Sequence, residues 1–187
     1  ITLAELIADA QQNDQVWCGP SAGGAKHIAA LQFWGELGID AKWVPFESGP
    51  DSLLAVMSGQ GVASVGNPGD VEGRELKHLV IATQENLAKY PDVPNFADLG
   101  YPVLDEISMW RGYAVKKGTP AEMIAWWQDL CQKVTEDPDW IQFFNEKSIV
   151  VHNITTEAFE AQVKADMTAH LEILKSVDMV EESYTIE

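Results

Sequence analysis

A short apolar run, a glycine-rich turn and a long apolar-periodic stretch follow one another near the start of this chain. Val16 and Trp17 open the segment VWCGPSAGGAKH, and apolar periodicity continues from residue 28 to residue 37. The pattern predicts a strand, a glycine loop and a helix in succession. Because the first turn of a helix presents free backbone N–H groups and the positive end of its dipole, we expect an anion site at this loop.

Strand and helix patterns alternate through the first half of the chain. Short apolar runs predict strands over residues 15–18, 41–45, 62–65 and 76–82. Between and around them, helices are predicted from a Thr2 cap to about residue 12, over 23–37 with a stop at Gly38, over 51–58 and over 95–99. This alternation indicates an α/β domain with a mostly parallel sheet.

The pattern changes near residue 107, beyond which helical periodicity dominates. Thr119 followed by Pro120 predicts a capped helix start, and Thr155 predicts the cap of a last helix. The expected elements are a strand over 107–115, helices to about 135, over 137–146 and over 156–175, and a short strand over 148–151. A mainly helical segment needs another sheet to pack on. We therefore expect two domains, of which the second, beginning near residue 107, is incomplete.

The charge balance restricts the class of partner. The formal net charge is −17, with 29 acidic residues against 12 basic ones. Nucleic acid and anionic membrane surfaces both need a basic footprint, so neither is expected as a partner. A pocket lined by neutral backbone groups can still bind a small anion. The chain has no run of 18 apolar residues, so insertion into a membrane is not expected either.

No pattern in the sequence indicates an enzyme, a metal site or a cofactor. The serine-hydrolase, phosphate-loop and zinc-protease motifs are all missing, and the histidines have no partners at metal-ligand spacing. Cys18 and Cys131 form no metal motif and are expected to be buried free thiols. The tryptophans of the predicted later helices, Trp126, Trp127 and Trp140, are expected in the core.

Several segments, in a fixed order over some 170 residues, resemble one family. They are the glycine loop with His27, VPFESG (44–49), VASVGNPGDV (62–71), PDVPNFADLGYP (91–102), WRGYAVKKGTPAEMI (110–124) and EDPDW (136–140). In this order they are similar to the bacterial solute-binding proteins of the tripartite tricarboxylate transporters, the TctC or Bug type. The chain begins ITLAEL, without an initiator methionine or a signal peptide, and is expected to be part of a longer protein.

The resemblance implies a type II periplasmic binding-protein fold, with two α/β lobes and a ligand cleft between them. Residues 1–108 would form one complete α/β lobe, and residues 109–187 a crossover strand with the helical remainder of the other lobe. The implied function is periplasmic capture of a small di- or tricarboxylate and its delivery to membrane permease subunits, without enzymatic activity or a cofactor. The alternatives are a ligand-sensing module of the same fold, and a fragment that binds nothing because half of its cleft is missing.

The resemblance places the carboxylate on the glycine loop, at Ser21, Ala22, Gly23 and Gly24. This loop departs from the family, which usually has glycine where Ser21 stands and often has serine where Gly24 stands. His27, one turn into the helix, is either a ligand donor or a buried imidazole, and the direction of its side chain favours the buried role.

Further ligand contacts are expected from other segments of the resemblance. They are Phe46, Asn67, Gly69, Trp110 and Arg111. Asn67 either binds ligand or forms a local turn before a proline. Arg111 either meets a ligand carboxylate in the cleft or pairs with one of many acidic side chains. Glu47 stands where the family commonly has lysine, which reverses the charge at that position.

Overall fold

The structure is a computed structural model that describes residues 1–107 and 109–186. Contacts divide the chain into two compact units. One unit comprises Ile1–Ser108 and His170–Glu187, and the other comprises Met109–Ala169. The expected correspondence of residues 1–108 and 109–187 to the lobes of a binding protein stays a prediction.

The first unit contains a parallel sheet of three strands. These are β1 (Gln15–Pro20), β2 (Ala41–Phe46) and β3 (Ala63–Ser64), in the order β2-β1-β3. In register, Trp17 on β1 lies opposite Trp43 on β2 and Ala63 on β3. The predicted α/β class with a parallel sheet is therefore confirmed.

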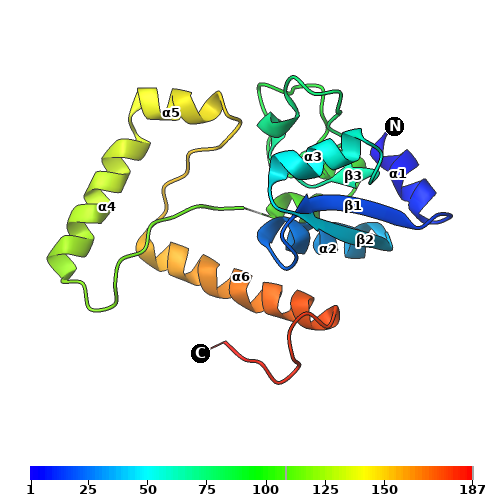
Figure 1. The fold of residues 1–187 in the computed structure, drawn as a ribbon. Helices are drawn as coiled ribbons and strands as arrows, with labels where there is room; N and C mark the ends of the chain where they lie inside the picture. Colours follow the sequence, from blue (N-terminus) through cyan, green and yellow to red (C-terminus); the bar gives the residue numbers. More distant parts are fainter. Residues whose placement is uncertain (108, 187) are drawn as a thin grey trace. The chain divides into compact units, whose positions relative to one another are not determined.

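Helices cover both faces of this sheet. α2 (Ala25–Leu37) connects β1 to β2, and α3 (Gly49–Met57) connects β2 to β3. The two connections run in opposite directions along the sheet, so right-handed crossovers place their helices on opposite faces. Figure 1 shows this arrangement, with α2 and α3 on either side of the strands.

Local sequence sets the ends of these helices. Thr2 caps α1 (Leu3–Ala10) in a capping box with Glu5, as predicted. Gly38 ends α2 in the left-handed conformation that glycine favours, with φ of 65°. α3 begins two residues earlier than predicted because the Ser48 side chain accepts the Asp51 N–H at 3.3 Å.

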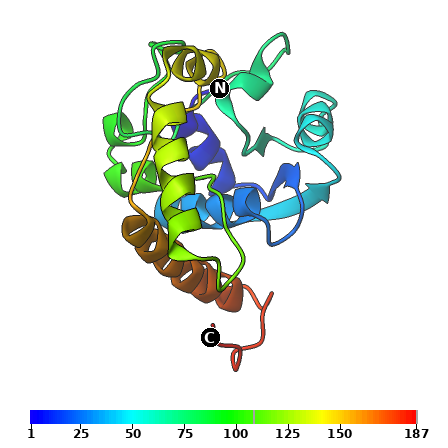
Figure 2. The same cartoon turned by 90° about the vertical axis from the view of Figure 1, so that its left-hand side faces the viewer.

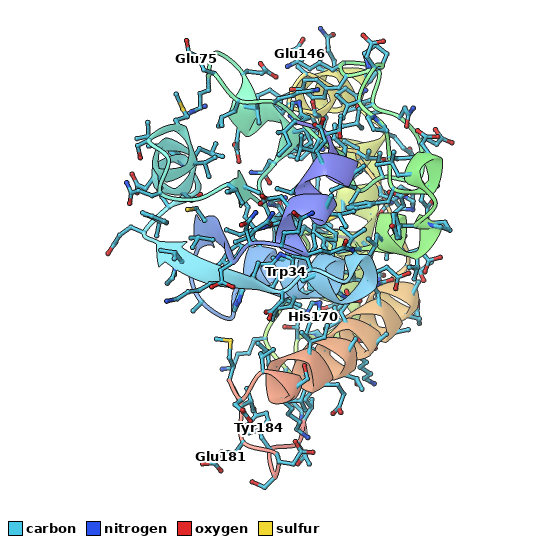
Figure 3. All side chains as sticks on the ribbon, turned by 90° about the vertical axis from the view of Figure 1, so that its right-hand side faces the viewer. Trp34, Glu75, Glu146, His170, Glu181 and Tyr184 are labelled. Atoms are coloured by element: carbon cyan, nitrogen blue, oxygen red, sulfur yellow. The ribbon has the colours of Figure 1, made fainter. Side chains whose placement is uncertain are left out.

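The core of the first unit lies between α1, α2 and the sheet. Its largest members are Leu6, Trp17, Trp34, Leu37 and Phe96, all buried. The rings of Trp17 and Trp34 meet edge to face, with centroids 5.6 Å apart. Trp34 comes from α2, as Figure 3 shows. The apolar face of α2 is thereby packed against β1.

The predicted strand over residues 76–82 is wrong. This stretch pairs with no strand and runs as an extended loop. Its apolar side chains Leu79, Val80 and Ala82 pack against the core, and the Ile81 N–H donates to the Pro94 carbonyl at 3.0 Å. The apolar content correctly indicated that this stretch packs against the core. A strand also requires a series of backbone hydrogen bonds to a neighbouring strand, and this stretch has only the single bond to Pro94.

Short 3-10 helices flank this loop, with η1 (Pro68–Val71) before it and η2 (Ala97–Leu99) and η3 (Pro102–Glu106) after it. Asp105, in η3, is a buried carboxylate that ties η3 to the start of η2 and to Thr83. It accepts the backbone N–H groups of Thr83 at 3.2 Å, Phe96 at 3.0 Å and Ala97 at 2.7 Å. The loop is therefore held by a buried acceptor.

The second unit contains α4 (Ala121–Thr135), α5 (Pro138–Asn145) and the first part of α6 (Thr156–Ser176). Figure 2 draws α4 and α5 as helices joined by a short turn. The predicted strands over 107–115 and 148–151 are wrong, since no described residue of either stretch is in a strand; Ser108 lies outside the described residues.

Two other predictions for this unit need correction. Pro120, not Thr119, caps α4, because the Thr119 hydroxyl donates instead to the Lys116 carbonyl at 2.7 Å.

The tryptophans of the later helices are exposed rather than in the core. Trp126 is 53%, Trp127 43% and Trp140 36% exposed. Among the described residues this unit has no strand, so no sheet face covers these rings. Cys18 is buried as expected, whereas Cys131 is only half-buried.

Replacing Asp105 tests the role of the buried carboxylate. Asp105→Ala should lower the free energy of unfolding by about 2–4 kcal/mol, because it leaves three backbone donors without their acceptor. Urea unfolding followed by circular dichroism measures the change. Asp92→Ala, at an exposed position of the same loop, is the matched control and should change stability by less than about 0.5 kcal/mol. Equal effects of the two substitutions would contradict the assignment.

Candidate ligand-binding site

The three parallel strands end at one edge of the sheet, and predicted ligand contacts lie at or just after the end of each. The glycine loop (residues 21–24) follows β1, Phe46 is the last residue of β2, and the turn over residues 66–70 comes shortly after β3. The carboxyl ends of parallel strands are where α/β sheets bind ligands. The sheet therefore brings together Ser21, Ala22, Gly23, Gly24, Phe46, Asn67 and Gly69 at one edge.

The glycine loop has an unusual backbone. Ser21 has φ of 51° and Gly23 has φ of 72°, both in the left-handed region. The Ser21 N–H donates to the Phe46 carbonyl at 3.2 Å, which ties the loop to the end of β2. Gly24 caps α2, and its carbonyl accepts the Ile28 N–H at 3.0 Å. The loop thus turns the chain sharply from strand to helix.

Two amides at this loop are free to bind an anion. Among the described residues, the N–H groups of Ala22 and Ala25 donate to no acceptor. The Gly24 N–H instead turns back toward the Ser21 carbonyl, since residues 22 and 23 form a hydrogen-bonded turn. The N–H of Gly23, in contrast, donates to Nδ1 of His27 at 3.0 Å. This amide is committed within the protein, so Gly23 contributes its backbone shape rather than a donor.

His27 is the buried imidazole that the sequence favoured. It is 7% exposed, and its ring stacks on that of Trp43 with centroids 4.9 Å apart and an interplanar angle of 26°. Trp34 meets the imidazole edge-on at 6.4 Å. Burial lowers the pKa of His27 below its ordinary value, because removal from water disfavours the charged ring.

An open pocket of about 520 Å³ lies at this edge. It is lined by Ser21, Pro45, Phe46 and Glu47. Two predicted contacts, Ser21 and Phe46, therefore share one hollow. Glu47 is exposed at the same place, so the pocket wall carries a negative charge next to the glycine loop.

Sequence reasoning missed a lysine at this site. Lys26, in the first turn of α2, places its Nζ 3.6 Å from Oδ2 of Asp70, and the two side chains are only 16% and 31% exposed. That separation is longer than a hydrogen bond. The available signal was position: a lysine at the positive end of a helix dipole is unfavourable and calls for an anionic partner. The partner is far away in sequence, so only the fold reveals it.

Backbone from the two other loops lies around this ion pair. A Cβ at Gly49 would come within 3.5 Å of Lys26 Nζ, and one at Gly66 within 3.6 Å of Asp70 Oδ2. Asn67 donates to the same oxygen from its N–H at 3.0 Å and its Nδ2 at 2.9 Å. The side chain of Asn67 thus serves the local turn, which was the alternative to ligand binding. Gly69 lies half-buried in η1.

The remaining predicted contacts belong to the second unit. The indole N–H of Trp110 donates to Asp166 at 2.5 Å, and the ring meets Phe159 edge to face at 4.9 Å. Arg111 is exposed and forms no ion pair with any described residue. Trp110 is therefore engaged with α6, whereas the Arg111 guanidinium remains available.

Neither metal-binding nor membrane-spanning features are found in the part of the chain that the structure describes. No three histidine, cysteine or acidic side chains lie close enough together to hold a metal ion. None of the described helices combines the length and apolar character that a membrane crossing requires.

Comparison with models of known protein families shows which family the chain belongs to. Residues 1–179 match the model of TctC, described as the tripartite tricarboxylate transporter family receptor. The chain belongs to this family. It is a family of transporter solute-binding proteins of the periplasmic type and is non-enzymatic. The comparison with curated proteins gave no match.

Solved structures show the same fold. A TctC solute-binding protein from Polaromonas is 22% identical, with a TM-score of 0.74, over 94% of this chain and 62% of its own. A periplasmic transporter is 21% identical, with a TM-score of 0.79, over 95% of this chain and 61% of its own. MatC from Rhodopseudomonas palustris, with bound malate, is 20% identical, with a TM-score of 0.60, over 96% of this chain and 62% of its own.

These matches also show how much of the related structures the chain covers. It spans about three fifths of the length of the structures it resembles. The fold is that of periplasmic binding proteins of this family over part of their length, as the resemblance implied.

Substitution of Gly19 tests the packing behind the site. A Cβ at Gly19 would overlap the ring of Trp43, the residue on which His27 stacks. Gly19→Ala should therefore displace that ring and lower stability by about 1–3 kcal/mol. Gly35→Ala is the matched control. Its Cβ would meet nothing within 4 Å inside α2, so it should be neutral or stabilise by up to about 1 kcal/mol. Urea unfolding monitored by tryptophan fluorescence measures both, and a harmless Gly19→Ala would refute this packing role.

Proposed function

We propose that this protein binds a small organic carboxylate in the periplasm and delivers it to the permease subunits of a tripartite tricarboxylate transporter. Its membership of the receptor family supports this role. The observation that carries the proposal is the sheet edge, where free loop amides and a half-buried lysine converge. A solved relative in this fold contains malate, a dicarboxylate.

The site can bind an anion in two ways at once. The N–H groups of Ala22 and Ala25 have no acceptor among the described residues and offer hydrogen bonds at the positive end of the α2 dipole. Lys26 adds a positively charged donor. Its Nζ lies 3.6 Å from Asp70 Oδ2, so the ammonium hydrogens remain available to a ligand carboxylate. Asp70 keeps the ammonium in place when no ligand is bound.

We assign the remaining contacts to a second lobe. The chain spans about three fifths of its structural relatives, so a complete receptor contains further residues that this chain lacks. In our proposal residues 1–108 form one lobe, and residues 109–187 the helical part of the other. Arg111 would then supply a bidentate partner for a second carboxylate, and Trp110 an apolar wall. Closure of the two lobes would enclose the ligand, and reopening would release it to the permease.

Calorimetric titration tests the proposed function. Malate, adipate and citrate are titrated into the chain at pH 7.5 and low salt. At least one of them should bind, with an affinity that falls as ionic strength rises, because the interaction is between charges. Lactate, a monocarboxylate, and a neutral sugar serve as control ligands. Absence of binding by all three polycarboxylates would refute carboxylate capture by this chain.

Substitutions of the two members of the ion pair should have different effects on affinity. Lys26→Met removes the positive charge and should weaken binding of the di- or tricarboxylate about tenfold or more, equivalent to a loss of about 1.4 kcal/mol. Asp70→Asn removes the competing carboxylate and should leave affinity unchanged or raise it. Lys42→Met, at an exposed position on β2, is the control for loss of charge alone. The same affinity for Lys26→Met and Lys42→Met would remove Lys26 from the site.

A further inference from the structure

We propose that His27 is a positioning residue that holds the glycine loop in its ligand-receiving conformation, and that protonation of its ring releases the loop. The decisive contact is the 3.0 Å hydrogen bond from the Gly23 N–H to Nδ1 of His27. The effect on ligand binding rests on the proposed function, whereas the state of the loop can be measured without any ligand.

The hydrogen bond requires a neutral imidazole. Nδ1 accepts the Gly23 N–H, so in this arrangement the ring proton of His27 is on Nε2. A protonated imidazole carries N–H groups on both nitrogens and has no acceptor left. Protonation therefore abolishes this bond and sets two N–H donors against each other across 3.0 Å. The contact can exist in only one of the two charge states of the ring.

The loop depends on this bond because its backbone is costly. Ser21 has φ of 51°, a left-handed conformation that costs a side-chain-bearing residue of the order of 1 kcal/mol. Gly23 has φ of 72°, which is accessible to glycine but not enforced by it. The His27 contact is the side-chain hydrogen bond that the described structure provides to the backbone of residues 21–24. Once it is lost, relaxation at Ser21 favours another path for the loop.

The surroundings of His27 hold its ring in place and favour the neutral form. Trp43 stacks on the imidazole, and Trp34 meets it edge-on. The indole N–H groups of both tryptophans are buried and have no acceptor among the described residues. The neighbouring rings thus offer no oxygen or anion that could accept a second imidazole N–H.

Charged groups near these contacts do not offset the preference of His27 for its neutral form. On α2 the neighbour of His27 is Lys26, which pairs with Asp70. On β2 the neighbour of Trp43 is Lys42, which is exposed, and residues 21–24 include no ionisable side chain. Burial is the cause of the lowered pKa of His27. Because burial lowers the pKa of His27 below its ordinary value, the bond is intact at neutral pH and is lost as the pH falls through that lowered pKa.

The proposal predicts how the affinity for the ligand changes with pH. Only the fraction of molecules with neutral His27 has the receiving loop, and the apparent dissociation constant is inversely proportional to that fraction. Below the pKa of His27 the fraction falls about tenfold for each pH unit, so affinity should fall with the same slope. The receptor would then capture its ligand at neutral pH and lose it in acid, with no change in any ligand-contacting side chain.

Nuclear magnetic resonance of the unliganded chain tests the loop directly. At pH 7.5 the ¹⁵N shifts of the His27 ring should show a protonated Nε2 and an unprotonated Nδ1. On lowering the pH, the Gly23 amide resonance should move upfield with the same midpoint as the ring, because it loses its acceptor. The Gly35 amide, inside α2, is the internal control and should not follow that midpoint. A Gly23 amide that is insensitive to the titration of His27 would overturn the proposal.

Two variants separate the hydrogen bond from simple packing. His27→Asn places an amide oxygen near the Nδ1 position and does not titrate, whereas His27→Phe keeps a ring of similar size without an acceptor. Malate binding to His27→Asn should stay within about threefold of the original chain at pH 7.5 and should lose the dependence on His27 protonation over the pH range in which the ring of the original chain titrates by nuclear magnetic resonance. Binding to His27→Phe should be at least tenfold weaker at pH 7.5. Near-native affinity for the Phe variant, or an unchanged pH slope for the Asn variant, would refute the positioning role.

The outcomes remain distinguishable from those of the proposed function. If malate, adipate and citrate all fail to bind at every pH, carboxylate capture is refuted, and the resonance titration of Gly23 still decides the role of His27. If near-ultraviolet circular dichroism shows that a variant is unfolded, the titration of the original chain alone decides. An amide that follows His27 supports the proposal, and one that does not overturns it.

Discussion

Parallel pairing of β1 with β2 and β3 is the constraint on which the rest of this structure depends. Because the strands run in one direction, all three end at the same edge, and their following loops meet there. The short connections through α2 and α3 also place the first turns of both helices at that edge. Free loop amides, the Lys26–Asp70 pair and an open pocket are consequences of this geometry rather than of any single motif.

A line of close contacts joins the sheet to the loop. Gly19 leaves room for the ring of Trp43, Trp43 stacks on His27, and His27 accepts the N–H of Gly23. Each step depends on a different physical term: the absence of a side chain, ring stacking in a buried site, and a directional hydrogen bond. Such a series lets packing in the interior determine a backbone conformation at the surface. In our proposal, protonation of Nδ1 of His27 therefore changes the conformation of the glycine loop at the edge of the sheet.

Local signals predicted elements well where a residue acts through its own backbone. Thr2 as a cap and Gly38 as a helix stop are confirmed because both effects operate within a few residues. Apolar runs were less reliable. Residues 76–82 and 148–151 were predicted as strands and are not, since an apolar run reports burial whereas a strand requires a partner ladder. Trp126 was predicted in the core but is exposed, because no strand of its unit covers it among the described residues.

By itself the sequence determined the α/β class, the glycine loop and the family, because periodicity, turn chemistry and the order of motifs are all properties of the linear chain. It also predicted ligand contacts in loops that the fold brings to one edge of the sheet. Only the tertiary structure showed that Lys26 faces Asp70 and that the Gly23 amide is already bound by His27. The physical reason is that charge pairing and hydrogen bonding depend on distance and direction in space. Those are set only when the strands pair and the helices pack against them.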